Sequence, residues 1–341
     1  MPTHERLLLE ESSNQESQPE TVTASIIIPN WNGKQHLEVC LSSLRGQSYK
    51  NFETILVDNG STDGSREFVK EYFPEVRLLE LGENLGFTGA CNAGYSQASG
   101  RFIILLNNDT EAEPAWLDAI VDAFERYPDV GIIASKILMY DQRDIFHSAG
   151  DLYRIDGIPI NRGVWKKDTG QYEKEEPVFS ACGAAAAYRR SLIEDVGFLD
   201  KEFYFSCEDV DMGWRAHKAG WKVLYIPTAV VYHKLKATGG SIVGSYYDGR
   251  NFLYLLWKHY PAFLWRTKWK SVAKAQMKIS CLALKNWRGE AARARLRGQI
   301  AGLLTIHKII NRRQAGKSQP DIAEDVLVSL LSPVDEHPGE K

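Results

Sequence analysis

The chain has 341 residues, of which 44% are hydrophobic and 25% are charged, a length that suits about two domains or one large elaborated domain. This composition is close to that of soluble globular proteins, so global disorder is excluded. No uncharged apolar run approaches the ~18 residues of a membrane-spanning helix, and the N-terminus lacks the features of a secretory signal. The five cysteines are scattered without a C-x-x-C pair, which argues against disulfides or a zinc ribbon and favours the cytoplasm.

The net charge of −3 conceals a strong asymmetry along the chain. Residues 255–317 contain fifteen Lys and Arg against one acid, Glu290, whereas the remainder carries a net charge of −17. A basic segment on an acidic body indicates an anionic partner, such as a membrane surface or nucleic acid. A solvated helical face would show the same charge, so both interpretations stay open at this point.

Residues 1–20 are polar and without periodicity, which predicts a flexible tail. Short apolar segments then alternate with amphipathic ones. The pattern predicts strands at residues 25–29, 53–57, 76–81 and 101–106, and helices at residues 34–47, 61–72, 87–98 and 114–127. Such alternation is typical of a parallel α/β sheet, which binds ligands outside the carboxyl ends of its strands.

The pattern changes after residue 131. The next segments predict a hairpin or mobile loop at 145–165, a small-residue segment at 179–188, a helix at 208–218 and a strand at 221–226. Beyond residue 245 the chain reads as mostly helical to residue 313, with a last short helix at about 321–331.

Two polar loops follow predicted strands. Asp58 opens D-N-G-S, where an acid at a strand end suits a ribose hydroxyl or a base N–H, although the following residues read as a helix cap. Asp109 closes N-N-D and could bind Mg²⁺ or Mn²⁺ that bridges to a diphosphate, although the motif alone is as typical of a turn. Gly86 lies at a helix opening whose N–H groups suit a phosphate or sugar, or it simply permits tight packing.

The densest polar cluster lies at residues 203–215, where Glu208, Asp209 and Asp211 begin a helix after an aromatic run. Like charges beside apolar walls raise the pKa of a carboxyl, which suits a general base. Acids at this position also complement the helix dipole. His233 would join Asp109 as a metal ligand if their loops converge, although a single histidine is more often structural.

Five segments in one order make the chain resemble the family 2 glycosyltransferases with the GT-A fold, especially their rhamnosyltransferase-like branch. They are S-I-I-I-P-N-W-N-G, I-L-V-D-N-G-S-T-D-G-S, E-N-L-G-F-T-G-A-C-N-A-G, L-L-N-N-D-T, and E-D-V-D-M-G-W-R followed by V-Y-H-K. The resemblance covers residues 24–245. It implies an α/β fold with a mixed sheet flanked by helices. Together with the composition, it divides the chain into a GT-A catalytic domain (21–245) and two parts outside the resemblance, a tail (1–20) and a basic helical C-terminal region (246–341).

The resemblance also implies an activity. The expected enzyme moves a sugar such as rhamnose, with inversion, from a dTDP, UDP or GDP donor to a glycan or lipid-linked acceptor in polysaccharide or cell-wall biosynthesis. Inversion needs a base and a cation but no covalent nucleophile, and the sequence shows no Ser–His or Cys–His constellation.

The resemblance assigns roles to particular residues. Asp209, with Glu208 beside it, would be catalytic, Asp209 as the general base. Asp109 and His233 would hold the cation, Mg²⁺ or Mn²⁺, and Asn107 stands where such enzymes carry the first Asp of D-x-D. The residues expected to bind the nucleotide sugar are Pro29, Asn30, Asp58, Asn84, Gly86, Phe87, Asn92, Asn107 and Asn108.

Three other classes fit less well. A sugar nucleotidyltransferase should show a basic Gly-rich loop near the first strand, but P-N-W-N-G is followed by its first basic residue only at Lys34. A non-catalytic nucleotide-sugar-binding module would lack the acid cluster. A nucleic-acid-binding protein would need stacking aromatics, whereas those of the basic segment look like packing positions.

The basic segment also predicts a location. Its tryptophans stand among Lys and Arg, which would hold a cytoplasmic enzyme on the inner face of the cell membrane. The alternative is that they pack at a domain or homodimer interface. These residues are Trp257, Trp265, Trp269 and Trp287.

Overall fold

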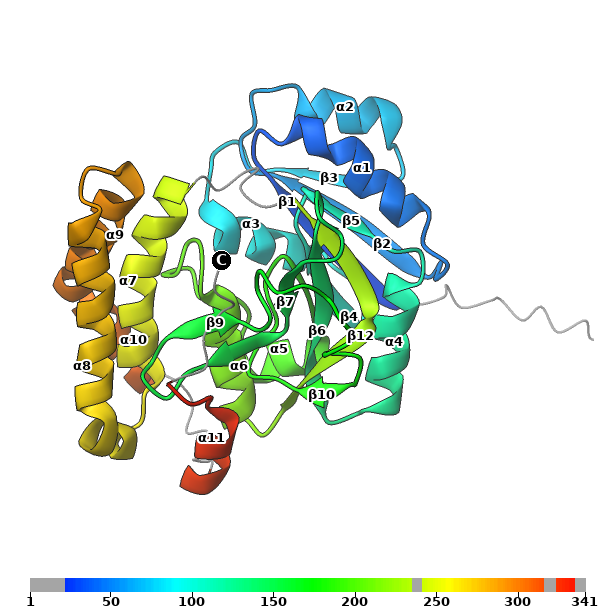
Figure 1. Cartoon of the computed structure of the whole chain (residues 1–341). Coiled ribbons are helices and arrows are strands. Elements are labelled where there is room, and N and C mark those ends of the chain that lie inside the picture. The colour runs from blue at the N-terminus through cyan, green and yellow to red at the C-terminus, as the bar shows by residue number, and fades with distance from the viewer. Residues whose placement is uncertain (1–21, 235–240, 316–322, 335–341) are drawn as a thin grey trace, which may run out of the picture.

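The first part of the chain folds as the predicted alternation of strands and helices in the computed structural model, which describes residues 22–234, 241–315 and 323–334 (Figure 1). The predicted tail at 1–20 lies outside this description. Four strands pair in parallel in the order β3-β2-β1-β4. They are β1 (Ala24–Asn30), β2 (Phe52–Asp58), β3 (Arg77–Glu80) and β4 (Phe102–Leu106). The helices that follow them are α1 (Lys34–Arg45), α2 (Ser65–Tyr72), α3 (Gly86–Tyr95) and α4 (Trp116–Arg126).

Beyond β4 the sheet becomes mixed. Strand β11 (Ala185–Arg189) lies antiparallel between β4 and β6 (Val130–Met139), and β12 (Lys222–His233) runs parallel to β6. Three short strands complete it: β5 (Thr110–Ala112), β7 (Phe146–Ala149) and β10 (Glu176–Pro177). The mixed sheet flanked by helices confirms the expected fold class.

Apolar side chains cover both faces of the sheet. Ile26 and Ile28 of β1 face the core shared with α1 and α4, whereas Ile27 between them faces the core shared with α3 and two further helices. These are α5 (Arg190–Val196) and α6 (Glu208–Lys218). Because a strand buried on both faces shows a continuous apolar run, the sequence pattern was informative for β1 and β4. A hairpin of β8 (Asp151–Tyr153) and β9 (Pro159–Asn161) lies within the predicted segment 145–165.

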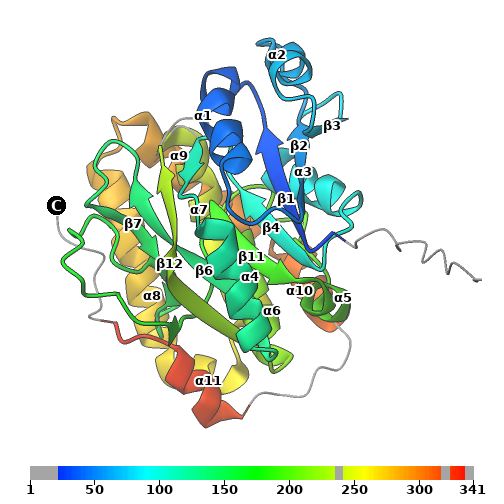
Figure 2. The ribbon, with the colours of Figure 1, turned by 90° about the vertical axis from the view of Figure 1, so that its right-hand side faces the viewer.

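The C-terminal region forms a bundle of helices beside α6, as Figures 1 and 2 show from two sides. Its elements are α7 (Ser241–His259), α8 (Ala262–Lys285), α9 (Glu290–Leu304), α10 (Ile306–Ala315) and α11 (Glu324–Leu330). A third core joins Val210 and Trp214 of α6 to Leu253 and Leu256 of α7. Among the helices of the described ranges, none is long and apolar enough to cross a bilayer.

Candidate active site

Asparagine side chains connect the loops at the carboxyl ends of the parallel strands. The Asn108 amide, after β4, donates to the amide oxygen of Asn30 at the end of β1 (2.7 Å). The Asn59 amide, after β2, donates to the Asn84 side chain (3.0 Å) and to the carbonyl of Gly86 (3.1 Å). Parallel strands end at one edge of a sheet, so the loops after all four strands, which are distant in sequence, form one polar floor.

A cavity of about 460 Å³ opens over this floor; we call it the donor cavity, because most of the residues expected from the sequence to bind the sugar donor line it. One wall comes from the strand ends and the start of α3: Pro29, Asn30, Trp31, Asn59, Asn84, Gly86, Phe87, Asn107 and Asn108. The other wall comes from the loop before α6 and from α7 and α9: Tyr204, Phe205, Ile242, Val243, Tyr246, Tyr247, Ala294 and Arg297. The Tyr204 and Tyr247 rings stack with centroids 5.2 Å apart and join the loop to α7.

Two residues expected in the nucleotide-sugar pocket lie outside the lining of the donor cavity. Asp58 is 1% exposed, and its Oδ1 accepts the backbone N–H of Ser61 (3.1 Å), which fixes the loop that presents Asn59. The Asn92 amide donates to the carbonyl of Leu199 (2.8 Å) and ties α3 to the segment before α6. Both side chains therefore shape the loops around the cavity.

A second cavity, of about 340 Å³, adjoins the donor cavity, because Phe87, Asn107 and Phe205 line both. We call it the acid cavity. It is lined by four carboxyl groups, two imidazoles and two thiols: Asp151, Glu208, Asp209, Asp248, His147, His233, Cys182 and Cys207. The expected catalytic pair and one expected metal ligand are thus brought into one space.

Asp209 is held at the amino end of α6 by backbone groups. Its Oδ2 accepts the N–H of Gly183 (2.8 Å), from the small-residue segment before β11. A Cβ at position 183 would lie 3.2 Å from Glu208 Oε1 and 3.5 Å from Asp209 Oδ2, so this approach leaves little room for a side chain. The small residues at 179–188 therefore let the backbone approach the carboxyl groups closely.

The environments of the carboxyls separate their proton affinities. Burial and the neighbouring charge of Asp209 raise the pKa of Glu208 and of Asp151 well above the usual range. Burial also raises the pKa of Asp209, but the N–H groups of Gly183 and Val210 oppose that shift. Hydrogen bonds to a carboxylate favour its charged form. Asp209 is therefore the carboxyl of these three that ionises most readily.

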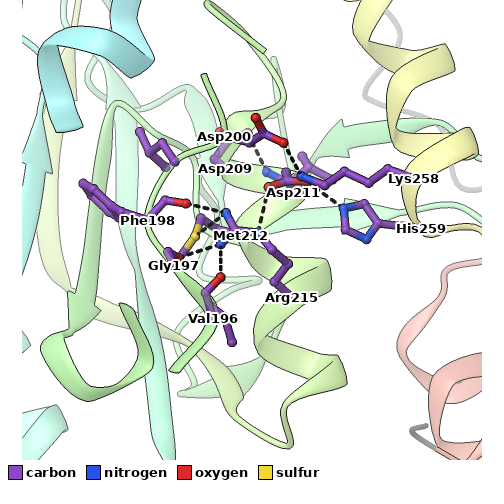
Figure 3. Close-up of polar contacts among 12 residues, drawn as sticks. Val196, Gly197, Phe198, Asp200, Asp209, Asp211, Met212, Arg215, Lys258 and His259 are labelled. Atoms are coloured by element: carbon purple, nitrogen blue, oxygen red, sulfur yellow. Dashed lines mark hydrogen bonds and ion pairs between the residues drawn. The ribbon is translucent and has the colours of Figure 1, made fainter. Parts of the chain in front are cut away.

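Asp211 points away from the cavities, into the contact between α6 and α7 (Figure 3). It is fully buried, and its carboxylate pairs with Lys258 (2.6 Å), His259 (2.7 Å) and Arg215 (2.8 Å). Lys258 also pairs with Asp200 (2.7 Å). The third acid of the sequence cluster thus fastens α6 to the C-terminal bundle.

Asp109 and His233 converge from β4 and β12. His233 Nε2 lies 3.1 Å from Asp109 Oδ1, and its Nδ1 lies 3.0 Å from Nδ1 of the buried His147. Burial lowers the pKa of His147 well below its usual value, so this ring is neutral. It can accept a hydrogen bond from His233 Nδ1–H, which would leave the Nε2 lone pair toward Asp109. A carboxylate and an oriented imidazole fit a divalent cation that also takes phosphate oxygens.

A second group with metal-ligand chemistry is Asp151, Cys182 and Asp209, whose ligand atoms all lie within 4.8 Å of one another. Burial and the adjacent acids raise the pKa of the Cys182 thiol well above its usual value. The thiolate is the form that binds metals, so a protonated thiol makes this a poor site. The Asp109–His233 pair is the better candidate.

The four tryptophans of the basic region do not share one surface. Trp257 and Trp265 stack on each other with centroids 5.3 Å apart and pack against the third core. Trp269 and Trp287 are 53% and 58% exposed. Two of the four are therefore partly buried in the packing of the bundle, whereas the other two are exposed.

The sheet order, with antiparallel β11 inside a parallel sheet and both cavities at the carboxyl edge, is that of the GT-A glycosyltransferases. The solved structure of GalNAc-T7 with UDP, GalNAc and Mn²⁺ superposes with a TM-score of 0.60 at 17% identity, over 75% of this chain and 52% of that one. The mannosyltransferase PcManGT from Pyrobaculum calidifontis, in complex with GDP-Man and Mn²⁺, gives a TM-score of 0.53 at 17% identity, over 82% and 86% of the two chains.

Sequence comparison identifies the family. The family model described as glycosyl transferase family 2 matches residues 25–197. The N-acetylglucosaminyl-diphospho-decaprenol L-rhamnosyltransferase of Mycobacterium tuberculosis is 33% identical over 227 residues, which are 60% of this chain and 74% of that protein. The O-antigen biosynthesis protein RfbC of Myxococcus xanthus is 29% identical over 63% of this chain and 17% of its own length. The chain belongs to glycosyl transferase family 2 and is a hexosyltransferase.

Several residues that line the two cavities were not predicted from the sequence. Trp31 and Asn59 are adjacent to predicted residues, so the motifs already pointed near them. Asp151 and Asn161 belong to the β8–β9 hairpin, whose sequence gave only a turn signal. The wall formed by α7 and α9 lies outside every motif, and only the folded chain brings it to the strand ends.

Proposed function

We propose that this protein transfers a hexosyl group, with rhamnosyl as the first candidate, from a nucleoside diphosphate sugar to a lipid-linked glycan acceptor. The transfer inverts the configuration at the anomeric carbon. The observation that carries the proposal is that the two cavities adjoin. Asp209 lines the acid cavity, the asparagine floor lines the donor cavity, and Phe87, Asn107 and Phe205 line both. The mycobacterial relative, named as acting on a decaprenol-linked acceptor, supports the sugar and acceptor class.

In this proposal the nucleotide sugar occupies the donor cavity and the acceptor hydroxyl enters the acid cavity. Asp209 removes the hydroxyl proton as the oxygen attacks the anomeric carbon, and the bond from that carbon to the diphosphate oxygen breaks. Burial and the charge of Asp209 raise the pKa of Glu208 and of Asp151 well above the usual range, and in their protonated forms both can donate hydrogen bonds to sugar oxygens. The reaction needs no covalent intermediate, because the acceptor oxygen attacks the anomeric carbon directly.

Asp109 and His233 would hold a divalent cation, Mg²⁺ or Mn²⁺, which when bound neutralises charge on the departing diphosphate. We predict that Asp109→Ala weakens Mn²⁺ binding, measured by electron paramagnetic resonance of free Mn²⁺. Asp118→Ala, which removes a carboxylate of α4 that lines neither cavity, is the control. Unchanged Mn²⁺ affinity in the Asp109 variant, or full turnover in excess EDTA, would reject this cation site.

A lipid-linked acceptor requires access to a membrane. The turn between α8 and α9 exposes Leu282 (52%), Leu284 (56%) and Trp287 (58%) beside the cationic Lys285 and Arg288. In both views this turn lies at the same end of the bundle as the start of α7, which lines the donor cavity (Figures 1 and 2). Apolar anchors among basic residues suit an anionic leaflet. We propose that this turn docks the enzyme on the inner face of the cell membrane.

We predict that the protein sediments with anionic vesicles at low salt, less at high salt, and weakly with neutral vesicles. Trp287→Ser with Leu284→Ser should reduce anionic-vesicle binding by at least about 10-fold, since each apolar side chain buried in the membrane contributes about 1.5–3 kcal/mol. Trp269→Ser changes an equally exposed indole near the other end of α8 and should have little effect. No binding to anionic vesicles at low salt would reject membrane docking and favour a dimer interface.

The donor is tested with a panel of dTDP-, UDP- and GDP-sugars, dTDP-rhamnose among them, with Mg²⁺ or Mn²⁺ and a prenyl-diphosphate-linked glycan. The expected result is acceptor-dependent release of a nucleoside diphosphate and a product of inverted anomeric configuration. Retained configuration would reject the single-displacement mechanism. No release from any sugar nucleotide would reject the transferase proposal for these donors.

A further inference from the structure

The donor cavity contains a single guanidinium. Over the described part of the chain, Arg297 of α9 is the one Lys or Arg side chain that lines either cavity. The acid cavity next to it contains four carboxyls. A nucleoside diphosphate carries at least two negative charges, so a site that binds it needs positive charge of its own besides a divalent cation. Arg297 lies a hundred residues beyond the segment that the family model matches.

Direct backbone contact fixes the position of α9 against α7. A Cβ on Gly298 would lie 1.9 Å from the carbonyl oxygen of Tyr246, and one on Gly249 would lie 2.4 Å from the carbonyl oxygen of Arg295. Helices this close cannot slide without a clash. Tyr246 and Tyr247 also line the donor cavity. This contact therefore places Arg297, the residue before Gly298, in the lining of the same cavity.

A polar chain then ties α9 to the loop that carries the catalytic helix. Arg295 pairs with Asp248 of α7 (2.9 Å), and Asp248 accepts the hydroxyl of Ser206 (2.6 Å). The neighbouring arginines of α9 are therefore occupied: Arg295 by this ion pair, and Arg293 by the carbonyls of Trp287 and Arg288. Within the described ranges no carboxylate pairs with Arg297, so its charge is available to a ligand.

We propose that Arg297 binds the diphosphate of the donor and stabilises it as it departs. This inference rests on the proposed function, and it assigns the C-terminal bundle a direct part in donor binding. A guanidinium forms two parallel hydrogen bonds to phosphate oxygens. Negative charge accumulates on the diphosphate as the glycosidic bond breaks, so a fixed cation favours the transition state over the bound donor. The nucleoside part is held by the asparagine floor on the opposite wall.

The test is calorimetric titration of the full chain with dTDP, UDP and GDP and with the corresponding nucleosides. Arg297→Gln should weaken binding of the preferred diphosphate roughly 10- to 100-fold, the range of a hydrogen bond to a charged group. Nucleoside affinity should change by less than about two-fold. Arg297→Lys retains the charge and should recover part of the loss. Arg293→Gln removes the same charge from the same helix outside the cavity and should bind diphosphate like the parent chain.

Equal diphosphate binding by Arg297→Gln and the parent chain would overturn the inference, and sugar transfer by the parent chain would then leave the proposed function intact. An equal loss in Arg293→Gln would also overturn it, because the effect would follow net charge alone. If the parent chain binds none of the three diphosphates, both the inference and the proposed function fail. Arg297 is an exposed helix residue, and thermal unfolding of each variant verifies that the fold is retained.

Discussion

Asp209 and Asp211 are two residues apart on α6 but have opposite surroundings. Successive residues of an α-helix are rotated by about 100°, so positions i and i+2 lie on nearly opposite faces. Asp209 faces the acid cavity, whereas Asp211 faces Lys258, His259 and Arg215 and is fully buried. One helix turn therefore carries both the proposed base and the ion pairs that anchor the helix.

We predict that Asp211→Asn lowers the free energy of unfolding by about 3–5 kcal/mol, because it leaves the buried Lys258 less well paired. Asp122→Asn, which removes an exposed pair with Arg126, should cost no more than about 1 kcal/mol. Urea unfolding at pH 7 measures both. Equal losses of unfolding free energy in the two variants would show that the buried network around Asp211 stabilises the fold no more than the exposed Asp122–Arg126 pair does.

The pH dependence of this difference follows from the pKa of Asp211. Burial by itself raises that pKa, but the charges of Lys258 and Arg215 overcome it and hold the pKa well below its usual value. A depressed carboxyl pKa adds stability above the unfolded-state pKa of about 3.9 and loses it as the pH falls toward the folded-state pKa. The difference between parent and Asp211→Asn should therefore be full at pH 7 and shrink below about pH 4.

At the level of elements, the loop before α6 is strained and is held by α7. Tyr204, Ser206 and Cys207 all have positive φ (61°, 69° and 68°), which costs roughly 1–2 kcal/mol for each non-glycine residue. The fully buried Asn251 donates its amide to the carbonyls of Phe203, Phe205 and Ser206 (2.7–3.0 Å). The loop that shapes both cavities thus depends on a side chain from the C-terminal bundle.

We predict that Asn251→Ala lowers kcat by at least about 10-fold while the KM for donor changes less, since losing the carbonyl contacts costs about 1–3 kcal/mol and relaxes the loop that carries Asp209. Asn286→Ala removes an exposed amide–carbonyl bond at the end of α8 and is the control. Steady-state kinetics on the preferred donor measures both. A kcat unchanged by Asn251→Ala would mean that the loop holds its shape without α7.

The carboxyl ends of the first four strands were predictable, because the apolar run of each strand and the polar loop after it are adjacent in the sequence. Apolar runs on β1 and β4 report burial on both faces, and the polar loops after them fall at one edge by topology alone. Strand β6 was not predicted, although all ten of its residues are buried. Gly131 is its second residue, and the amine of its buried Lys136 pairs with Asp168 (2.6 Å) and Glu173 (2.9 Å), partners that are distant in the sequence.

At the scale of the whole molecule, the site is divided between two parts of the chain. The strand ends and α3 supply one wall of the donor cavity, and α7 and α9 supply the other. Sequence patterns identified the first wall through its motifs. They could not identify the second, because helix–helix contact through Gly249 and Gly298 and the bonds of Asn251 join segments with no periodic relation. The basic composition of the C-terminal region was visible, but the placement of Arg297 required the fold.

The same division explains why the four tryptophans have two roles. Trp257 and Trp265 complete the core that fastens the bundle to α6, and their stack could not be distinguished from membrane anchors by composition. Trp287 remains exposed at the α8–α9 turn. We therefore expect membrane docking to act through one end of the bundle and to orient the donor cavity toward the lipid-linked acceptor.

The most direct test of the account is the turnover of Asp209→Asn with the preferred donor and acceptor, compared with Glu208→Gln. A general base contributes about 10²–10⁴-fold to the rate, so Asp209→Asn should lose that factor while donor affinity stays within a few-fold. Burial and the charge of Asp209 raise the pKa of Glu208 well above the usual range, which disfavours its ionised form, so Glu208→Gln should retain most of the turnover. The parent activity should fall on acidification through a pKa above that of an ordinary aspartate. Near-normal turnover by Asp209→Asn would contradict the account.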